Sequence, residues 1–214
     1  HRLHLGQVGF RLIKSDGSEA KASDITDIEQ KLDLWTGIIH SNFKFEREVV
    51  KVQTAVNPDR DELALCVDSP LLAKKKLTIR ISFPYGSQTM QGVDWNYPEK
   101  HLSEIIGRGP SGCLVQRTMD KDQYFAVIGW PVAAQLTPEK NHAFLIGAES
   151  SSSLDVSIRF LADKSQAEIQ LARNILKYSS ERWERFWQTG AAVDFAGSID
   201  PRAKELERRV VLSQ

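Results

Sequence analysis

Residues 37–56 read GIIHSNFKFEREVVKVQTAV, and no other stretch of the chain indicates the fold as clearly. Apolar and polar side chains alternate along residues 37–45 and again along residues 49–56. This two-residue period is typical of β-strands that bury one face. The short polar segment 46–48 lies between the two runs. We therefore expect an antiparallel hairpin with one apolar face.

The alternation continues on both sides of this hairpin, from Leu3 to about Phe160, and turn residues interrupt it about every ten positions. A second hairpin is predicted where residues 113–119 and 124–130 flank the turn 120–122. Further strands are expected at residues 7–13, 28–34, 62–68, 77–83, 142–149 and 154–161. Because roughly ten strands need two layers, the sequence predicts a mainly β protein built as an antiparallel two-sheet sandwich.

Residues 84–110 break this rhythm, because they contain three prolines and four glycines with aromatic residues between them. Proline and glycine favour turns over regular strands, so we expect one long loop here. Loops of this length are uncommon inside compact domains and often carry function. This loop is therefore the first place to look for a binding site.

From Lys164 onward the sequence has the period of a helix. Ser165 and Glu168 have the spacing of a capping box, in which two side chains satisfy backbone amides at the helix start. Apolar residues then recur on one helical face, at Ile169, Ala172, Leu176, Trp183 and Trp187. Gly190 stands where a C-terminal cap is expected. The sequence thus predicts a long helix after the sandwich.

A second helix is expected from Asp200, which would cap it, with Pro201 in its first turn. Ala203, Leu206 and Val210 follow at helical spacing and form an apolar stripe. Gln214 falls inside this helix, and nothing in the chain is expected to cover the stripe. We therefore expect the natural polypeptide to continue. The alternative is a short helix folded back on the sandwich.

Several motifs resemble one enzyme family. They are ERWERFW at 181–187, VDF at 193–195, ELERRVVLSQ at 205–214, DLWTG at 33–37, FPY at 83–85, DWN at 94–96 and KH at 100–101. Together they resemble the N-terminal part and linker of six-hairpin glycosidases related to glycoside hydrolase family 65, in particular of uncharacterised bacterial members. The Trp-x-x-Phe-Trp pattern before a two-helix junction is the most specific of them.

The resemblance implies a super-sandwich at residues 1–163, followed at residues 164–214 by a helical linker and the first helix of an α/α barrel. It implies that the catalytic carboxylates lie in that barrel, a downstream domain of the same polypeptide. The chain would then be a non-catalytic part of a glycoside hydrolase or phosphorylase that acts on carbohydrate. We also expect a periplasmic or secreted protein whose signal sequence is not part of this chain.

The residues themselves offer no catalytic pair. Glycoside hydrolysis needs two carboxyl groups held about 5 to 9.5 Å apart across a sugar, and no such pair follows from the spacing of the acidic residues. Asp59, Asp61 and Glu62 cluster after a proline and are interpreted as a solvated turn. No HExxH motif and no Cys/His cluster is present in the sequence, so we expect neither a metal site nor a cofactor.

One constellation in the predicted loop suits a ligand. It consists of Tyr85, Trp95, Asn96, Tyr97, Lys100 and His101. A sugar has apolar C–H faces ringed by hydroxyl groups, so aromatic platforms beside amide, imidazole and ammonium groups recognise it. We predict carbohydrate contact for Tyr85, Trp95, Asn96, Lys100 and His101. The alternative is that the aromatic residues only pin the loop to the sandwich.

Composition excludes other classes of protein. Lys plus Arg and Asp plus Glu both number 28, so the chain lacks the positive field of a nucleic-acid binder. No run of about 18 apolar residues occurs, so no membrane span is expected. Cys66 and Cys113 lie in apolar strand-like runs and are expected to be buried free thiols.

Two other functions stay open at this point. One is an autonomous carbohydrate-binding module, and the other is a protein-interaction domain that uses the Trp183 helix as its docking surface. We predict that Trp183, Phe186 and Trp187 are packing anchors which contact the sandwich or a following domain. An anchored linker favours the N-terminal module of a larger enzyme.

Overall fold

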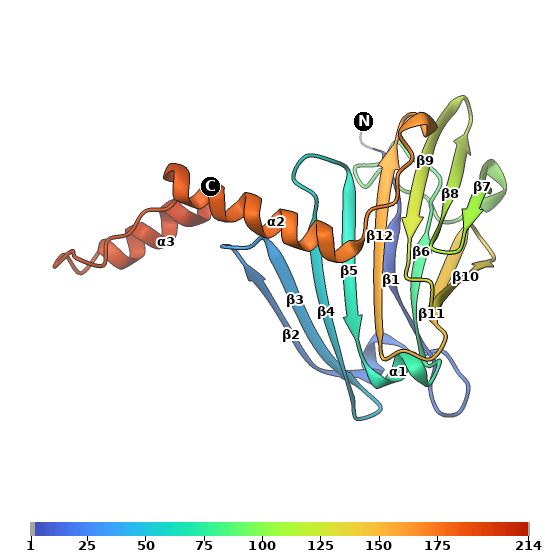
Figure 1. Ribbon diagram of the computed structural model, residues 1–214, viewed down its shortest axis with the longest axis horizontal. Helices are drawn as coiled ribbons and strands as arrows, with labels where there is room; N and C mark the ends of the chain where they lie inside the picture. Colours follow the sequence, from blue (N-terminus) through green and yellow to red (C-terminus); the bar gives the residue numbers. More distant parts are fainter. Residues whose placement is uncertain (1–2, 214) are drawn as a thin grey trace.

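Twelve antiparallel strands form two stacked sheets in the computed structural model, which describes residues 3–213 (Figure 1). The larger sheet has the strand order β2-β3-β4-β5-β12-β9-β8-β7, and the smaller has the order β1-β6-β11-β10. The strands are β1 Gln7–Leu12, β2 Ile25–Asp33, β3 Ile38–Phe45, β4 Glu48–Val56, β5 Glu62–Asp68, β6 Leu77–Ser82, β7 His101–Gly109, β8 Gly112–Met119, β9 Asp122–Gly129, β10 Ala134–Glu139, β11 Ala143–Ala148 and β12 Ser153–Leu161. The predicted mainly β, two-sheet sandwich is confirmed.

Short helical segments join or follow the strands. They are η1 Ala22–Asp24, α1 Pro70–Ala73, η2 Pro98–Lys100, η3 Lys164–Gln166, α2 Ala172–Phe186, the π turn η4 Trp187–Ala191 and α3 Ala203–Ser213. Among the helices of residues 3–213, none is long and apolar enough to cross a membrane.

The core lies between the two sheets and follows the alternation of the sequence. Val50 and Val52 of β4 face Ile79 and Ile81 of β6, and all four are buried in one cluster. Cys113 belongs to the same cluster. Burial of these apolar side chains is the main favourable term in folding.

Both cysteines are buried free thiols, as predicted. Cys66 lies on the other face of the larger sheet from the core, beneath α2. Burial raises the pKa of both Cys66 and Cys113 to about 12, so neither is a reactive thiolate near neutral pH.

The two predicted hairpins are present. Glu46 and Arg47 form the turn between β3 and β4, and both have positive φ, 47° and 71°. Positive φ at both central positions is the mark of the tight turn that suits the twist of paired strands. The second hairpin pairs Met119 of β8 with Asp122 of β9 across a two-residue turn.

Two strands were not predicted. Residues 101–109, expected within one long loop, form β7, and the loop itself covers residues 83–100. β7 lies at the edge of the larger sheet, and its register shifts between Ile105 and Gly107, which hides the alternation. β10 contains Pro138, which a strand tolerates because β10 is the edge of the smaller sheet.

The predicted long helix begins later than expected. Asp163 caps the η3 turn by accepting from the backbone N–H of Ser165 at 2.9 Å, so the predicted Ser165–Glu168 capping box is wrong. α2 starts only at Ala172. The predicted C-terminal position of Gly190 is correct, because this residue has a φ of +114° at the end of the helical run.

Ile169 belongs to the extended segment before α2 and not to a helical face. Its side chain lies directly over the backbone of Gly112 and Gly129, where an added Cβ would come within 2.3 and 2.6 Å of Ile169 carbons. The two glycines therefore make room for this segment on the outer face of the larger sheet.

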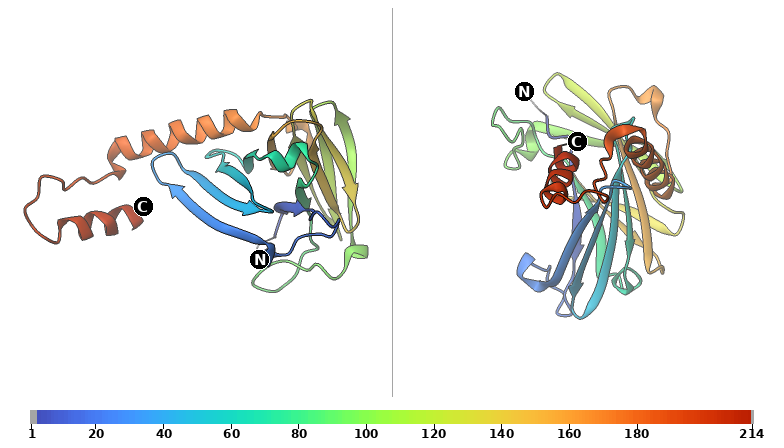
Figure 2. Two further views of the ribbon diagram at one scale, coloured as in Figure 1. Left: turned by 90° about the horizontal axis from the view of Figure 1, so that it is seen from below. Right: turned by 90° about the vertical axis from the view of Figure 1, so that its left-hand side faces the viewer.

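α2 crosses the outer face of the larger sheet over β12, β5 and β4 (Figure 1). Ile175 and Leu176 pack on Ala55, Ala64 and Cys66 of the sheet. The two alanines let the helix backbone approach the strands closely. After α2 the chain turns, and α3 runs back toward the tip of the β2–β3 hairpin (Figure 2).

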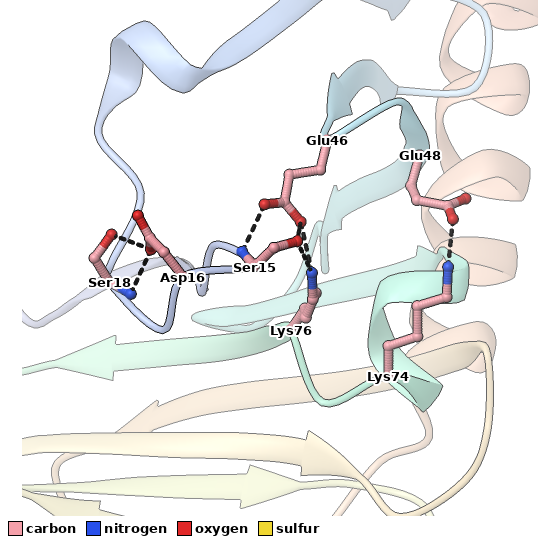
Figure 3. A network of polar contacts seen from close by, with 7 residues as sticks. All are labelled: Ser15, Asp16, Ser18, Glu46, Glu48, Lys74 and Lys76. Atoms are coloured by element: carbon pink, nitrogen blue, oxygen red, sulfur yellow. Dashed lines mark hydrogen bonds and ion pairs between the residues drawn. The ribbon is translucent and has the colours of Figure 1, made fainter.

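A network of polar side chains ties the two sheets at the end where β3 turns into β4 (Figure 3). The Glu46 carboxylate accepts from the Ser15 backbone N–H at 2.6 Å and from Lys76 Nζ at 2.6 Å. The hydrogen bond from Lys76 is the main reason that the pKa of Glu46 falls to about 2. Glu48 pairs with Lys74 beside it. Ser15 and Lys76 adjoin strands of the smaller sheet, so the network closes this end of the sandwich.

The turn before β5 is only partly solvated. Asp59 and Asp61 are exposed, as predicted, but Glu62 is only 2% exposed. The Glu62 carboxylate accepts a hydrogen bond from Nδ2 of Asn57 at 2.8 Å. Glu62 was therefore wrongly assigned to the solvated turn, because it is the first residue of a strand and its side chain is buried against Asn57.

Candidate functional site

The loop of residues 83–100 is closed near its base by a small antiparallel bridge. The backbone N–H of Tyr85 donates to the carbonyl of Asp94 at 3.0 Å, and the N–H of Asp94 donates to the carbonyl of Tyr85 at 2.8 Å. Residues between these two positions form an exposed tip that includes Met90. Two aromatic residues, Trp95 and Tyr97, follow the bridge directly.

Arg117 of β8 holds both ends of this loop. Its guanidinium donates to the carbonyl of Pro84 at 3.1 Å, where the loop begins, and to the carbonyl of Leu102 at 2.6 Å, just after it ends. The Arg117 side chain is wholly buried. Burial lowers its pKa, and its hydrogen-bond partners within residues 3–213 are all uncharged groups. Burying an arginine without a charged partner is costly. Its hydrogen bonds to the carbonyls of Pro84 and Leu102 hold the backbone at both ends of the loop in place.

Arg117 was not recognised from the sequence. It occupies an inward-facing position of β8, two residues after Val115 and two before Met119, both buried. A charged residue at an apolar position of an alternating strand is the signal that could have revealed it.

His101 lies buried at the base of the loop, with 5% of its surface exposed. Its Nδ1 is 2.6 Å from Arg117 Nη2, and its ring centroid is 3.9 Å from that of His142. Burial, with smaller effects of His142 and Arg117, lowers the pKa of His101 to about 4. At neutral pH His101 is therefore uncharged and accepts the hydrogen bond from Arg117. This geometry makes it a support of the loop.

His142 completes the support. Its Nε2 lies 2.6 Å from the carbonyl of Pro98, and its Nδ1 lies 3.1 Å from Ser103 Oγ. It sits in the turn before β11 with a φ of 58°. Both ring nitrogens of His142 thus have partners, so this residue is a satisfied structural group.

The exposed part of the loop presents two aromatic rings. Trp95 and Tyr97 are 45% and 43% exposed. Lys100 Nζ lies 3.7 Å from the Tyr97 ring centroid and 5.8 Å from that of Tyr85, so the ammonium group covers one face of Tyr97. Within residues 3–213, Trp95 has one aromatic contact, an edge-on contact with His4 at 6.4 Å between ring centroids. Trp95 therefore offers the less obstructed ring.

Polar side chains around these rings already make hydrogen bonds to other residues of the chain. The Tyr85 hydroxyl donates to the Asp120 carboxylate at 2.8 Å, which raises the pKa of Tyr85. Asn96 Nδ2 donates to Asp94 Oδ1 at 3.1 Å. The structure brings Tyr85, Lys100 and His101 together, whereas Trp95 and Asn96 lie further along the loop. Their contact with carbohydrate stays a prediction.

A second functional feature is an aromatic cluster where α2 meets the hairpin tip. Trp183 stacks on Trp187 at 6.2 Å between ring centroids, and Phe186 lies edge-on to both. Trp187 is 5% exposed, and its Nε1 donates to the Leu34 carbonyl at 2.5 Å. An added Cβ at Gly37 would lie 2.1 Å from Trp183 Cδ1, so this ring rests on the glycine backbone. The predicted contact with the sandwich is confirmed for Trp183 and Trp187, whereas Phe186 packs on these two rings.

This cluster joins two of the motifs that define the resemblance. The segment DLWTG at 33–37 forms the tip of the β2–β3 hairpin, and ERWERFW at 181–187 ends α2. We call these contacts among Leu34, Gly37, Trp183 and Trp187 the aromatic junction. Two stretches far apart in sequence thus form one structural unit.

Over residues 3–213, no three His, Cys, Asp or Glu side chains converge closely enough to hold a metal ion.

Comparisons with known proteins identify the fold. No family model matches the chain, and no curated protein matches its sequence. Among solved structures, a bacterial glucoamylase in complex with acarbose is similar, with a TM-score of 0.57 and 9% sequence identity. The similarity covers 90% of this chain and 33% of that one, so the chain spans about a third of the glucoamylase's length. At this identity the likeness shows the fold alone: a glucoamylase contains this arrangement of sandwich and helices.

Proposed function

We propose that the chain is the non-catalytic N-terminal β-sandwich of a glycoside hydrolase, which supports a downstream α/α-barrel domain. One observation carries the proposal: the aromatic junction fixes the end of α2 to the hairpin tip, while α3 beyond it stays uncovered. A fixed end of α2, followed by a helix α3 whose apolar residues are exposed, is suited to position another domain.

The exposure of α3 supports a further partner. None of its residues is buried, and Leu206 and Leu212 are 52% and 63% exposed. Ile199, just before the helix, is fully exposed. A contiguous patch of exposed apolar residues is a mark of an interaction surface. The partner that we propose is a catalytic domain of the same polypeptide.

The similarity to a glucoamylase supports a catalytic domain as the partner of α3. That chain is about three times as long as the part that matches, so the shared fold there belongs to a larger enzyme. The relation to glycoside hydrolase family 65 is a finer proposal. It rests on the motifs DLWTG at 33–37 and ERWERFW at 181–187, which contribute the residues of the aromatic junction.

In this proposal the residues of the chain bind carbohydrate and position the catalytic domain, and they cleave no glycosidic bond. The carboxylates that protonate the leaving oxygen and attack or activate water would belong to the barrel. Whether water or phosphate attacks the sugar would depend on that domain. Trp95, held on a loop that Arg117 clamps at both ends, would stack against the C–H face of a sugar at the rim of the pocket.

The experiment is a kinetic comparison in the full product of the gene. Trp95→Ala should raise KM or lower kcat/KM for oligosaccharide hydrolysis by about fivefold, because stacking on one ring contributes on the order of 1 kcal/mol. Val132→Ala, at an exposed residue in the turn before β10, is the matched control. Wild-type kinetics for Trp95→Ala would remove the loop from the proposal, and hydrolysis by residues 1–214 alone would contradict the non-catalytic role.

An autonomous carbohydrate-binding module is the second candidate. The exposed rings of Trp95 and Tyr97 favour it, because such modules bind sugars on exposed aromatic residues. The aromatic junction and α3 together argue for the enzyme module, since a self-contained binding module has no need of a further helix, beyond the junction, whose apolar residues remain exposed.

A further inference from the structure

A polar groove lies where the turn between β4 and β5 meets the first turns of α2. It has a volume of about 360 Å³ and is lined chiefly by Asn57, Asp59, Arg60, Gln170, Asn174 and Tyr178. Small-molecule sites typically enclose about 300–1,000 Å³, so the groove is large enough for a small ligand. It lies beside α2, away from the loop of residues 83–100, which occupies the opposite side of the molecule (Figure 2).

The turn that forms one wall is held rigidly. The backbone N–H of Asn57 donates to the Glu62 carbonyl at 2.8 Å, and Asn57 Nδ2 donates to the Glu62 carboxylate at 2.8 Å. Asn57 Oδ1 accepts from the Asp59 backbone N–H at 3.1 Å. Both Asn57 and Glu62 are buried. The buried pair therefore fixes the positions of Asp59 and Arg60, and a rigid wall lowers the entropy lost on binding.

The other wall presents an aromatic ring and two amides. The Tyr178 hydroxyl donates to the Asp59 carboxylate, which orients the ring, and the ring is 42% exposed. The side-chain amides of Gln170 and Asn174 make no hydrogen bond within the described part of the chain. Each amide can donate and accept, which is what a hydroxyl group of a ligand requires.

The charges of the groove favour a neutral ligand. Asp59 and Arg60 are neighbours of opposite charge, and Arg60 also lies 3.9 Å from Glu168. Arg182 and Arg185 also act on the Tyr178 hydroxyl, so acidic and basic groups surround the groove together and neither sign of charge dominates. A metal ion would need a cluster of acidic or imidazole ligands, which residues 3–213 do not form. A flat aromatic ring, amides and a balanced ion pair are together suited to a molecule with many hydroxyl groups.

We infer that this groove binds a short neutral saccharide. The sugar ring stacks on Tyr178, and its hydroxyl groups bond to Asn174, Gln170 and Arg60. The inference rests on the groove's own residues and needs neither the downstream domain nor the glucoamylase similarity. It adds a carbohydrate site that is separate from the loop of residues 83–100.

The test is an NMR titration of the 15N-labelled chain with maltotriose, cellotriose and xylotriose, and with inorganic phosphate as the charged comparison. At least one saccharide should shift the side-chain amide signals of Gln170 and Asn174 and the backbone signals of residues 59–60. Asn174→Ala and Arg60→Ala should each weaken that binding about fivefold, the effect of losing roughly one hydrogen bond. Both residues are exposed, so the fold should persist, and thermal melting checks this.

Gln135→Ala, at an exposed amide on β10 of the smaller sheet, is the matched control and should leave binding at the groove unchanged. The inference is overturned if no saccharide shifts these signals at tens of millimolar, if phosphate alone shifts them, or if Asn174→Ala binds as tightly as the wild type. Saccharide binding here, combined with an α3 that no other domain covers, would leave this inference standing while the proposed function failed.

Discussion

The indole Nε1 of Trp187 donates a hydrogen bond to the backbone carbonyl of Leu34 at 2.5 Å, across 153 positions of sequence. The bond joins the end of the α2 helical run to the tip of a hairpin at the edge of the larger sheet. Trp183 adds a second contact by resting on Gly37 of the same tip. The direction in which the chain leaves α2 toward α3 therefore depends on the indole rings of Trp183 and Trp187.

Trp187 should be a major contributor to stability. Trp187→Phe keeps the ring in place and removes the N–H donor, so it should lower the free energy of unfolding by about 1 kcal/mol. Trp187→Ala also leaves a cavity and should cost about 3 kcal/mol or more. Urea unfolding followed by circular dichroism measures both. Trp95→Ala, at an exposed ring, should change the midpoint little. Equal midpoints for Trp187→Ala and wild type would show that the junction contributes nothing.

Any side chain at position 37 is expected to destabilise the fold. Gly37 has a φ of +67°, and a Cβ there would lie 2.1 Å from Trp183 Cδ1. Gly17 has a φ of +86° but no atom within 4 Å of an added Cβ, so it isolates the backbone effect. Gly17→Ala should cost about 1 kcal/mol, and Gly37→Ala should cost about 1–3 kcal/mol more because the indole must move. If Gly17→Ala and Gly37→Ala lower the free energy of unfolding equally, the Trp183 ring moves away from a new side chain at no cost.

Ile169 and Gly129 should be energetically coupled. A Cβ at position 129 would lie 2.6 Å from Ile169 Cγ2 and 2.6 Å from Ser157 Oγ. Gly129→Ala should therefore lose less stability in an Ile169→Ala background than in the wild type, by about 1 kcal/mol. A double-mutant cycle from chemical denaturation gives this value. Additive losses would show that the segment before α2 does not rest on this strand.

The loop support should weaken in acid. The pKa of His101 falls from 6.5 to about 4 in the folded chain, so the protonated form favours the unfolded state. Its contribution is complete above about pH 6.5 and is lost as the pH falls toward 4, for a total of up to about 3 kcal/mol. His101→Asn retains an acceptor for Arg117 without a titrating group, so its stability should decline less over this range. Parallel pH profiles of unfolding for the two proteins would contradict the role of His101.

The sequence patterns predicted most of the fold because alternation is strong wherever one face of a strand is buried. β5 was predicted at its observed bounds of Glu62–Asp68, and the hairpin at Glu46 was placed correctly. β7 and β10 were missed because edge strands tolerate a bulge, glycines and a proline, and these weaken the period. The start of α2 was misplaced because the Ser165 and Glu168 spacing fits a cap, while Asp163 competes for the same amide.

The candidate site was predictable only in its composition. Aromatic and polar residues within a proline- and glycine-rich segment identified the loop, and Trp95 and Tyr97 are indeed exposed there. The buried support could not be read from spacing, because Arg117 and His142 reach the loop from other strands and turns. The groove beside Tyr178 also joins distant segments, and no local motif connects residues 57–60 with 170–178.

Hydrogen–deuterium exchange at α3 tests the central claim most directly. The comparison is between residues 1–214 and the full product of the gene, with α2 as the internal reference. We predict that the backbone amides of Ala203–Ser213 exchange rapidly in residues 1–214 and become strongly protected in the full product, because a downstream domain covers Leu206 and Leu212. Equal exchange of α3 in the two proteins would contradict the account.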